Sequence, residues 1–132
     1  MFLALRHKLR VFTSKIREKK KEKRRSKDWS EVRDNFLSLN PTCAACGGTE
    51  KLQVHHIIPF HVNEKLELDE NNLITLCMGK DECHLAIGHG DSWKCYNPRV
   101  ERDARKYLSS DEGHRRFLIE EIKSKRFHSS KA

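Results

Sequence analysis

Residues 43–84 read CAACGGTEKLQVHHIIPFHVNEKLELDENNLITLCMGKDECH, and this stretch decides the fold. It opens with the pair Cys43 and Cys46 and closes with the pair Cys77 and Cys83. Four thiolates in two pairs are the ligand set of a closed structural zinc site, so the spacing predicts that one Zn²⁺ holds this segment together. The alternative, four small buried apolar residues, does not explain the pairing.

Two adjacent histidines, His55 and His56, lie inside the frame of cysteines. Segment 52–58 is rich in β-branched residues and stops at Pro59, which predicts a strand. Neighbouring side chains on a strand point to opposite faces, so the two imidazoles cannot easily bind one ion. One can instead bind a cation while the other takes a proton from water, which is the division that phosphodiester hydrolysis needs. A strand pair with solvent-exposed rings is the alternative.

Further candidate ligands follow the last cysteine. His84 and His89 lie on a predicted helical turn that begins at residue 83, at a spacing close to that at which two imidazoles share an ion. Asn72 stands just before a second predicted strand, 73–76, where its amide could bridge backbone groups and fix the strand that carries the base. Asn71 competes with Asn72 for this role.

Composition limits the class of protein. With 132 residues, 36% of them hydrophobic and 35% charged, the chain allows one small domain with a thin core, which a metal site would stabilise. Arg6 and His7 interrupt the opening apolar residues, so no signal peptide is expected, and no apolar run approaches the ~20 residues that span a membrane. We therefore expect a cytoplasmic protein without a membrane partner, where paired cysteines favour metal over disulfides. Cys95 is expected to be a free thiol, buried or half-buried.

Charge is unevenly distributed within the net charge of +8. Residues 1–27 hold 12 Lys/Arg and two Glu, residues 28–92 hold four Lys/Arg and 11 Asp/Glu, and residues 93–132 hold 11 and six. An acidic middle therefore lies between two basic arms. Basic arms suit DNA or RNA, whereas the acidic middle would repel such a partner unless bound metal and the arms offset it.

The chain divides into three predicted parts: a basic extension at 1–27, a domain at 28–97 and a helical extension at 98–132. The first 16 residues allow an amphipathic helix, and the basic run 19–25 is interpreted as an arm that binds nucleic acid. A solvated tail and an anchor to an anionic membrane surface are the alternatives to that arm.

Helices are predicted on both sides of the cysteine frame. The first spans 29–39 and ends before Pro41, because the residue before a proline avoids the helical region. Two helices are expected in 98–132, the second starting from a capping box at 109–112. The apolar side of the first helix is expected to be buried, and consists of Trp29, Val32, Phe36, Leu37 and Leu39. Trp29 and Trp93 are expected to be core anchors, and surface positions are expected for His7, His61, His114 and His128.

Taken in order, the motifs Cys43-x-x-Cys46, residues 54–59, residues 72–77 and Cys83-His84 resemble an HNH endonuclease of the zinc-containing kind, similar to bacterial and phage members. The resemblance covers about residues 41–90. It implies an α+β fold with a small ββα-metal core, in which two antiparallel strands and a helix surround one catalytic cation, with flanking helices and a zinc site of four cysteines. It also implies roles for individual residues: His55 and His84 as metal ligands, His56 as general base and Asn72 as the organiser of the base. His89 remains a further candidate ligand because of its spacing from His84.

The sequence departs from the family's pattern in two places. Five residues separate Cys77 from Cys83 where two are usual, which predicts a loop insertion. His55 stands where an aspartate is frequent, and a nitrogen ligand favours softer divalent ions. Mn²⁺, Ni²⁺ or Zn²⁺ are therefore expected to serve as the catalytic cation alongside Mg²⁺.

The predicted function is that of a metal-dependent DNA endonuclease, nicking or cutting both strands, that leaves 5′-phosphate and 3′-hydroxyl ends. Cutting both strands with one active site per chain would need a homodimer or two successive nicks. One alternative is a zinc-dependent nucleic-acid-binding module without catalysis. Another is a structural or regulatory zinc protein that binds a protein partner through its C-terminal helices.

Overall fold

The computed structural model describes residues 24–125. The amphipathic helix expected in the first 16 residues, most of the basic run 19–25, and both His7 and His128 lie outside the described residues. The elements in chain order are α2 (Trp29–Leu39), β1 (Leu52–His56), the 3₁₀ turns η1 (Glu64–Leu66) and η2 (Glu70–Asn72), β2 (Leu73–Cys77), the π-helical turn η3 (His84–Gly88), α3 (Val100–Ser109) and α4 (Glu112–Ser124).

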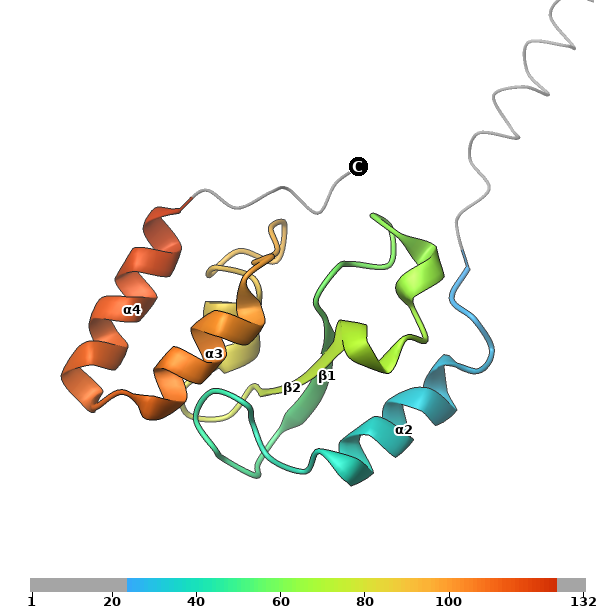
Figure 1. The fold of residues 1–132 in the computed structure, drawn as a ribbon, viewed down its shortest axis with the longest axis horizontal. Coiled ribbons are helices and arrows are strands. Elements are labelled where there is room, and N and C mark those ends of the chain that lie inside the picture. Colours follow the sequence, from blue (N-terminus) through green and yellow to red (C-terminus); the bar gives the residue numbers. More distant parts are fainter. Residues whose placement is uncertain (1–23, 126–132) are drawn as a thin grey trace, which may run out of the picture.

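The two strands form an antiparallel hairpin, in which Leu52 pairs with Cys77 and His56 pairs with Leu73. Figure 1 shows the hairpin between α2 on one side and the α3–α4 pair on the other. All five residues of β2 are buried, as expected for a strand covered by other elements. The fold class predicted from the sequence is confirmed: a mixed α+β chain with a small two-stranded sheet, consistent with a ββα-metal core.

The first strand is shorter than predicted, because it ends at His56 and not at Ile58. The backbone of Ile58 still makes two hydrogen bonds, but both go to the side chain of Asn72: Ile58 N–H donates to Oδ1 over 2.9 Å, and Nδ2 donates to the Ile58 carbonyl over 3.0 Å. The side-chain amide of Asn72 thus replaces the backbone hydrogen bonds that Ile58 would make if the strand continued. The second strand runs one residue beyond the prediction, to Cys77.

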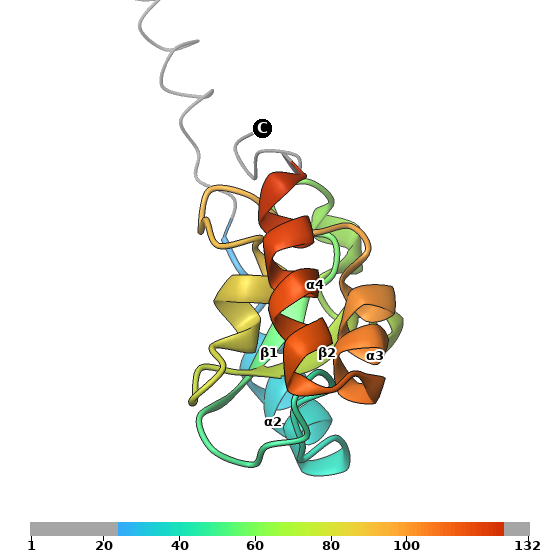
Figure 2. The same ribbon diagram turned by 90° about the vertical axis from the view of Figure 1, so that its left-hand side faces the viewer.

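The buried core joins the hairpin to the C-terminal half of the chain. Its fully buried side chains include Leu76 on β2, Ile87 on η3 and Val100 on α3, and Ile122 of α4 packs into the same cluster. Figure 2 shows α4 lying across the front of this assembly, beside α3 and over the strands. The core is small, and its cluster includes three cysteine side chains, so any metal that binds them acts on the core itself.

Helix α2 has the predicted bounds, and Asn40 closes it with its backbone N–H and its Nδ2 both donating to the carbonyl of Phe36. Its burial is less than predicted. Trp29, Val32, Phe36 and Leu37 are only half-buried, and Leu39 is 75% exposed, so its placement on the buried side was wrong. Of the two strands, β1 is the one against which α2 packs, so only part of the apolar surface of the helix is covered.

The predicted start of the last helix was also displaced. Helix α3 runs to Ser109, and the N-cap of α4 is Asp111, whose carboxylate accepts the backbone N–H of His114 over 2.9 Å. An aspartate two residues after the predicted cap therefore satisfies the free amide of the first turn. Leu108 of α3 and Phe117 of α4 are 51% and 69% exposed.

Candidate active site

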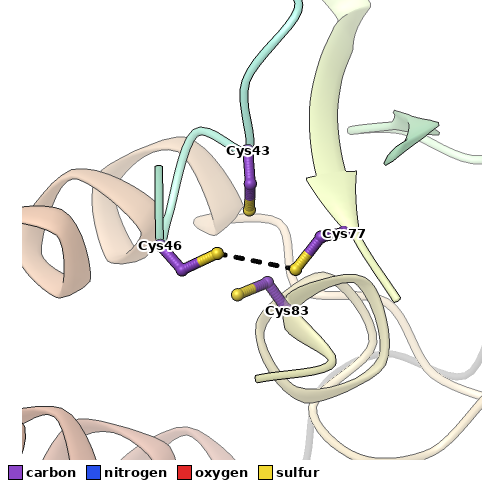
Figure 3. Close-up of side chains that lie close together, drawn as sticks. All are labelled: Cys43, Cys46, Cys77 and Cys83. Atoms are coloured by element: carbon purple, nitrogen blue, oxygen red, sulfur yellow. Dashed lines mark hydrogen bonds between the residues drawn. The ribbon is translucent and has the colours of Figure 1, made fainter. Parts of the chain in front are cut away.

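Four cysteines converge from three segments of the chain. Cys43 and Cys46 stand in the loop before β1, Cys77 ends β2, and Cys83 directly precedes η3, with all four side chains turned toward one centre (Figure 3). Their sulfur atoms lie within 4.8 Å of one another, and the Sγ atoms of Cys46 and Cys77 are 3.6 Å apart. None of these cysteines forms a disulfide.

The loop geometry brings the first pair together. Gly47 has φ of +75°, a left-handed conformation that suits glycine, and this lets the chain reverse so that Gly47 N–H donates to the carbonyl of Cys43. Gly48 N–H then donates to Sγ of Cys46 over 3.4 Å. The longer second gap closes through a turn in which Glu82 N–H donates to the carbonyl of Gly79. The five-residue spacing therefore does not prevent Cys83 from reaching the cluster.

The donor set fits a structural metal ion. Four thiolates at ~2.3 Å from a tetrahedral ion would place their sulfurs about 3.8 Å apart, close to the observed Cys46–Cys77 separation. A hydrogen bond from Cys83 lowers the pKa of the Cys43 thiol to about 4, whereas burial raises the pKa of Cys46 to about 11. Crowded like charges oppose the ionisation of every thiol in such a cluster, and a bound cation would let all four bind as thiolates.

Three histidines from β1 and the η3 segment form a second cluster. His55 of β1, His84 of η3 and His89 just after η3 have ring centroids 4.9–5.0 Å apart, and each offers a nitrogen within 4.8 Å of the other two. The five-residue π turn explains the geometry: residues i and i+5 lie one π turn apart, so His84 and His89 share a face. The α-helical spacing used in the sequence prediction only approximated this.

Hydrogen bonds orient the two histidines that flank the turn. Nδ1 of His89 lies 2.6 Å from the carbonyl oxygen of Cys95, and Nδ1 of His84 lies 2.7 Å from Oε1 of Gln53. Oxygen acceptors at Nδ1 make each Nδ1 the donor, which leaves the lone pair on Nε2 free for a cation. Gln53 lies two residues before His55 on β1, so strand alternation, had it been applied to this residue, could have placed it on the ligand face.

His55 is buried, and its Nε2 is the buried side-chain polar atom for which the described residues provide no hydrogen-bond partner. Burial lowers the pKa of His55 well below its usual value, and the nearby His84 and His89 lower it further. Burial also lowers the pKa of His84, to about 4, and the pKa of His89. Three neutral imidazoles, one of which has a buried nitrogen without a hydrogen-bond partner, fit the ligand set of a divalent cation.

His56 faces away from this cluster, as strand alternation predicted. Its Nε2 lies 2.9 Å from the carbonyl oxygen of Glu67 and therefore donates to it, so Nδ1 is left as the atom that can accept a proton. The indole of Trp29 stacks on the imidazole, with ring centroids 4.3 Å apart. Burial lowers the pKa of His56, and the charge of Arg25 lowers it further, so the ring is a neutral acceptor at neutral pH.

Asn72 is buried and holds the loop after His56. Besides its two hydrogen bonds to the Ile58 backbone, its Nδ2 donates to the carbonyl of Leu66 over 3.2 Å. One amide thus ties three backbone groups from two segments. Asn71, the competing candidate, is exposed and donates its backbone N–H to Asp69 instead.

A cavity of about 240 Å³ joins the three-histidine cluster to His56. It is lined by Arg25, Val54, His55, His56, Pro59, Phe60, His61, His84, His89 and Trp93. A larger hollow of about 790 Å³ lies beside the cysteines, but it contains no histidine, and its Arg115 is engaged with the carbonyl of Tyr107. The chemistry therefore points to the smaller cavity.

Both tryptophans lie beside histidine rings of the candidate site and not in the core. Trp93 is not a core anchor: it is 53% exposed and lies against the rings of His84 and His89 at 5.3 and 4.8 Å between centroids. Trp29 is half-buried against His56. His61 and His114 are exposed, as predicted, and Cys95 is a half-buried free thiol. Arg25, which lines the cavity, was expected only as one residue of the basic run 19–25, and Glu67, whose carbonyl binds His56, carried no signal in the sequence.

Comparison with known proteins supports the resemblance seen in the sequence. The family model described as HNH endonuclease matches residues 43–90, which contain both cysteine pairs, the three-histidine cluster, His56 and Asn72. No significant match was found among curated proteins or among solved structures. The match indicates a nuclease or nucleic-acid-binding function with a nucleic acid as substrate or ligand. Across residues 24–125, no helix is both long and apolar enough to cross a membrane.

Proposed function

We propose that the segment matched by the HNH endonuclease family makes this protein a metal-dependent DNA endonuclease. The observation that carries the proposal is the division of labour across β1. His55 joins two further imidazoles on one face, while His56 is held as a neutral proton acceptor on the other, and both open into one cavity. A module that only binds nucleic acid would not need a base beside a cation site.

Two metal ions are assigned different residues. We assign a structural Zn²⁺ to Cys43, Cys46, Cys77 and Cys83. We assign a catalytic divalent cation to His55, His84 and His89, where a bound ion would stabilise negative charge on the phosphate and on the departing oxygen. An all-nitrogen set favours Mn²⁺, Ni²⁺ or Zn²⁺ over Mg²⁺.

His56 is the proposed general base. Because Nε2 donates to the Glu67 carbonyl, Nδ1 takes a proton from water, and the oxygen of that water attacks phosphorus in line with the bond to the 3′ oxygen. The P–O3′ bond then breaks, the 3′ oxygen takes a proton from solvent, and the products carry 5′-phosphate and 3′-hydroxyl ends. Asn72 contributes by fixing the loop at Ile58 that follows the base.

The rest of the chain is proposed to bind DNA. Residues 1–27 form a basic extension, residues 28–97 the nuclease domain and residues 98–132 a helical extension. The basic segments 19–27 and 99–105 would contact backbone phosphates without reading sequence, so the affinity should fall steeply with salt. Cutting both strands would require a homodimer or two successive nicks.

Plasmid relaxation by the purified protein tests the proposal. Supercoiled DNA is incubated with Mg²⁺, Mn²⁺, Ni²⁺, Zn²⁺ or EDTA, using the wild type, His56→Ala, His55→Ala and the control His114→Ala, whose exposed ring lies outside the cavity. We expect metal-dependent nicking that disappears in the first two variants and persists in the control. No cleavage with any metal, together with salt-sensitive DNA binding, would favour the binding module instead.

A further inference from the structure

Arg25 is held at the mouth of the candidate active site by two aromatic rings. Its guanidinium carbon lies 5.6 Å from the ring centroid of Trp29 and 4.9 Å from that of Phe60. Trp29 in turn stacks on His56, and both Phe60 and Arg25 line the cavity that holds the histidines. Stacking on two rings restricts a side chain that would otherwise sample many rotamers, so the charge is already oriented toward the cavity.

The backbone next to Arg25 is fixed by a buried carboxylate. Ser26 N–H donates to both oxygens of Glu67, over 3.0 and 3.2 Å, across 41 residues of sequence. Glu67 is 4% exposed, and its own carbonyl accepts the hydrogen bond from His56. One buried residue therefore holds both the proposed base, through its backbone, and the segment that carries Arg25, through its side chain.

Among the described residues that line the cavity, Arg25 adds a fixed positive charge of the protein to the candidate cation site. Apart from Arg25, its lining consists of imidazoles, aromatic rings, Val54 and Pro59, with no carboxylate and no second arginine or lysine. A guanidinium is always charged, and its planar fork matches two phosphate oxygens.

We infer that Arg25 binds the phosphodiester that is cut, and that Glu67 is the positioning residue that holds Arg25 at the cavity. This inference rests on the proposed function, because it names the group that receives the substrate at the same site. It separates Arg25 from the rest of the basic arm. Arm residues add affinity through backbone phosphates anywhere on the duplex, whereas Arg25 acts on the phosphate that reacts.

Single-turnover cleavage tests the role of Arg25. We expect Arg25→Ala to lower the rate at saturating protein about 100-fold, the effect of removing one preoriented donor from a charged transition state, and Arg25→Lys to recover part of it. The control Arg33→Ala removes one exposed arginine of α2 that does not line the cavity, and should leave the rate unchanged. Equal rates for Arg25→Ala and Arg33→Ala would overturn the inference.

A binding measurement keeps this test separate from the proposed function. Anisotropy of a fluorescein-labelled duplex is measured in the His56→Ala background, with and without Arg25→Ala or Arg33→Ala. If the wild type cuts no DNA, a larger loss of affinity from Arg25→Ala than from Arg33→Ala still supports a phosphate contact, and equal losses overturn it. The absence of cleavage overturns the endonuclease proposal, and the comparison of the two affinities decides separately whether Arg25 contacts a phosphate.

The role of Glu67 is tested by non-additivity. Glu67→Ala removes the acceptor for Ser26 N–H but leaves the backbone carbonyl that binds His56, whereas Glu67→Gln keeps an acceptor oxygen. We expect Glu67→Ala to slow cleavage, Glu67→Gln to restore most of the rate, and the Arg25→Ala/Glu67→Ala double variant to be no slower than Arg25→Ala alone. If the rate loss of the double variant equals the product of the two single losses, Glu67 does not act through Arg25. This comparison requires variants whose circular dichroism spectra match that of the wild type.

Discussion

The four-cysteine cluster and the three-histidine cluster each take one residue from the same small hairpin, yet their surroundings differ. Cys43, Cys77 and Cys83 are buried and belong to the core, and the sulfur atoms of all four cysteines lie within 4.8 Å of one another. The histidines instead border a cavity that also holds His56 and Arg25. A closed site stabilises the fold, and an open site leaves room for a substrate. The comparison predicts that disrupting the four-cysteine cluster unfolds the domain, whereas disrupting the three-histidine cluster abolishes DNA cleavage and leaves the fold intact.

The largest expected effect comes from breaking the cysteine cluster. Cys43→Ser should leave the domain largely unfolded at ordinary temperature, because the metal contributes to a core that is too small to be stable alone, and a small domain is stable by only about 5–15 kcal/mol. His84→Ala is the matched variant at the other site and should retain the fold. Far-ultraviolet circular dichroism and the zinc content measure both. A folded, zinc-containing Cys43→Ser protein would contradict this assignment.

Metal removal should separate the two sites in time. A chelator reaches the histidine cluster through the cavity, so we expect it to remove that ion first, with loss of cleavage and an unchanged circular dichroism spectrum. The buried thiolate site should release its zinc only as the secondary structure is lost. Metal content, activity and circular dichroism are followed on the same sample. Simultaneous loss of all three signals would mean that the two sites are not independent.

A smaller effect is expected from a single methyl group at Gly88. A Cβ there would lie 3.2 Å from Cε1 of His55 and 3.2 Å from Cδ1 of the fully buried Leu76. Gly88→Ala should therefore displace His55, destabilise the domain by about 1–3 kcal/mol and slow cleavage. Denaturant unfolding and single-turnover cleavage measure these two effects.

Gly113→Ala provides the matched control for Gly88. A Cβ at Gly113 would meet its nearest atom, Oδ1 of Asp111, at an ordinary 3.6 Å, on the exposed first turn of α4. Alanine is the better helix former, so this variant should stabilise the protein by up to about 1 kcal/mol and leave cleavage unchanged. If Gly88→Ala behaved like Gly113→Ala, the close packing of His55 against η3 would have no importance for the site.

Much of the hairpin could be predicted from the sequence, because its signals are local. The cysteine pairs indicated a metal cluster, alternation separated His55 from His56, and Asn40-Pro41 set the end of α2. Burial was predicted less well. Leu39 and Trp93 are apolar by type, but one ends a helix that packs on a single strand and the other stands in a short loop beside the cavity, so neither reaches the core.

The parts of the site that could not be predicted depend on long-range contacts. Glu67 holds Ser26 across 41 residues, and nothing in the pattern around either residue indicates that pairing. Arg25 looks like any other residue of a basic run until the positions of Trp29 and Phe60 are known. The π turn that aligns His84 with His89 has no periodic signature in five residues. Such features depend on the path of the chain between elements.

The smallest expected effect is spectroscopic, and it reports the open site directly. Trp93 lies 5.3 and 4.8 Å from the rings of His84 and His89, whereas Trp29 stacks on His56, which is not assigned as a ligand. Ni²⁺ has an open d shell and quenches an indole at short range, so it should quench Trp93 more than Trp29, and Zn²⁺, with a closed shell, should reverse the quenching by competition. Trp93→Phe should abolish most of the response and Trp29→Phe should preserve it. The opposite result would place the ion beside His56 and reverse the roles assigned to the two faces of β1.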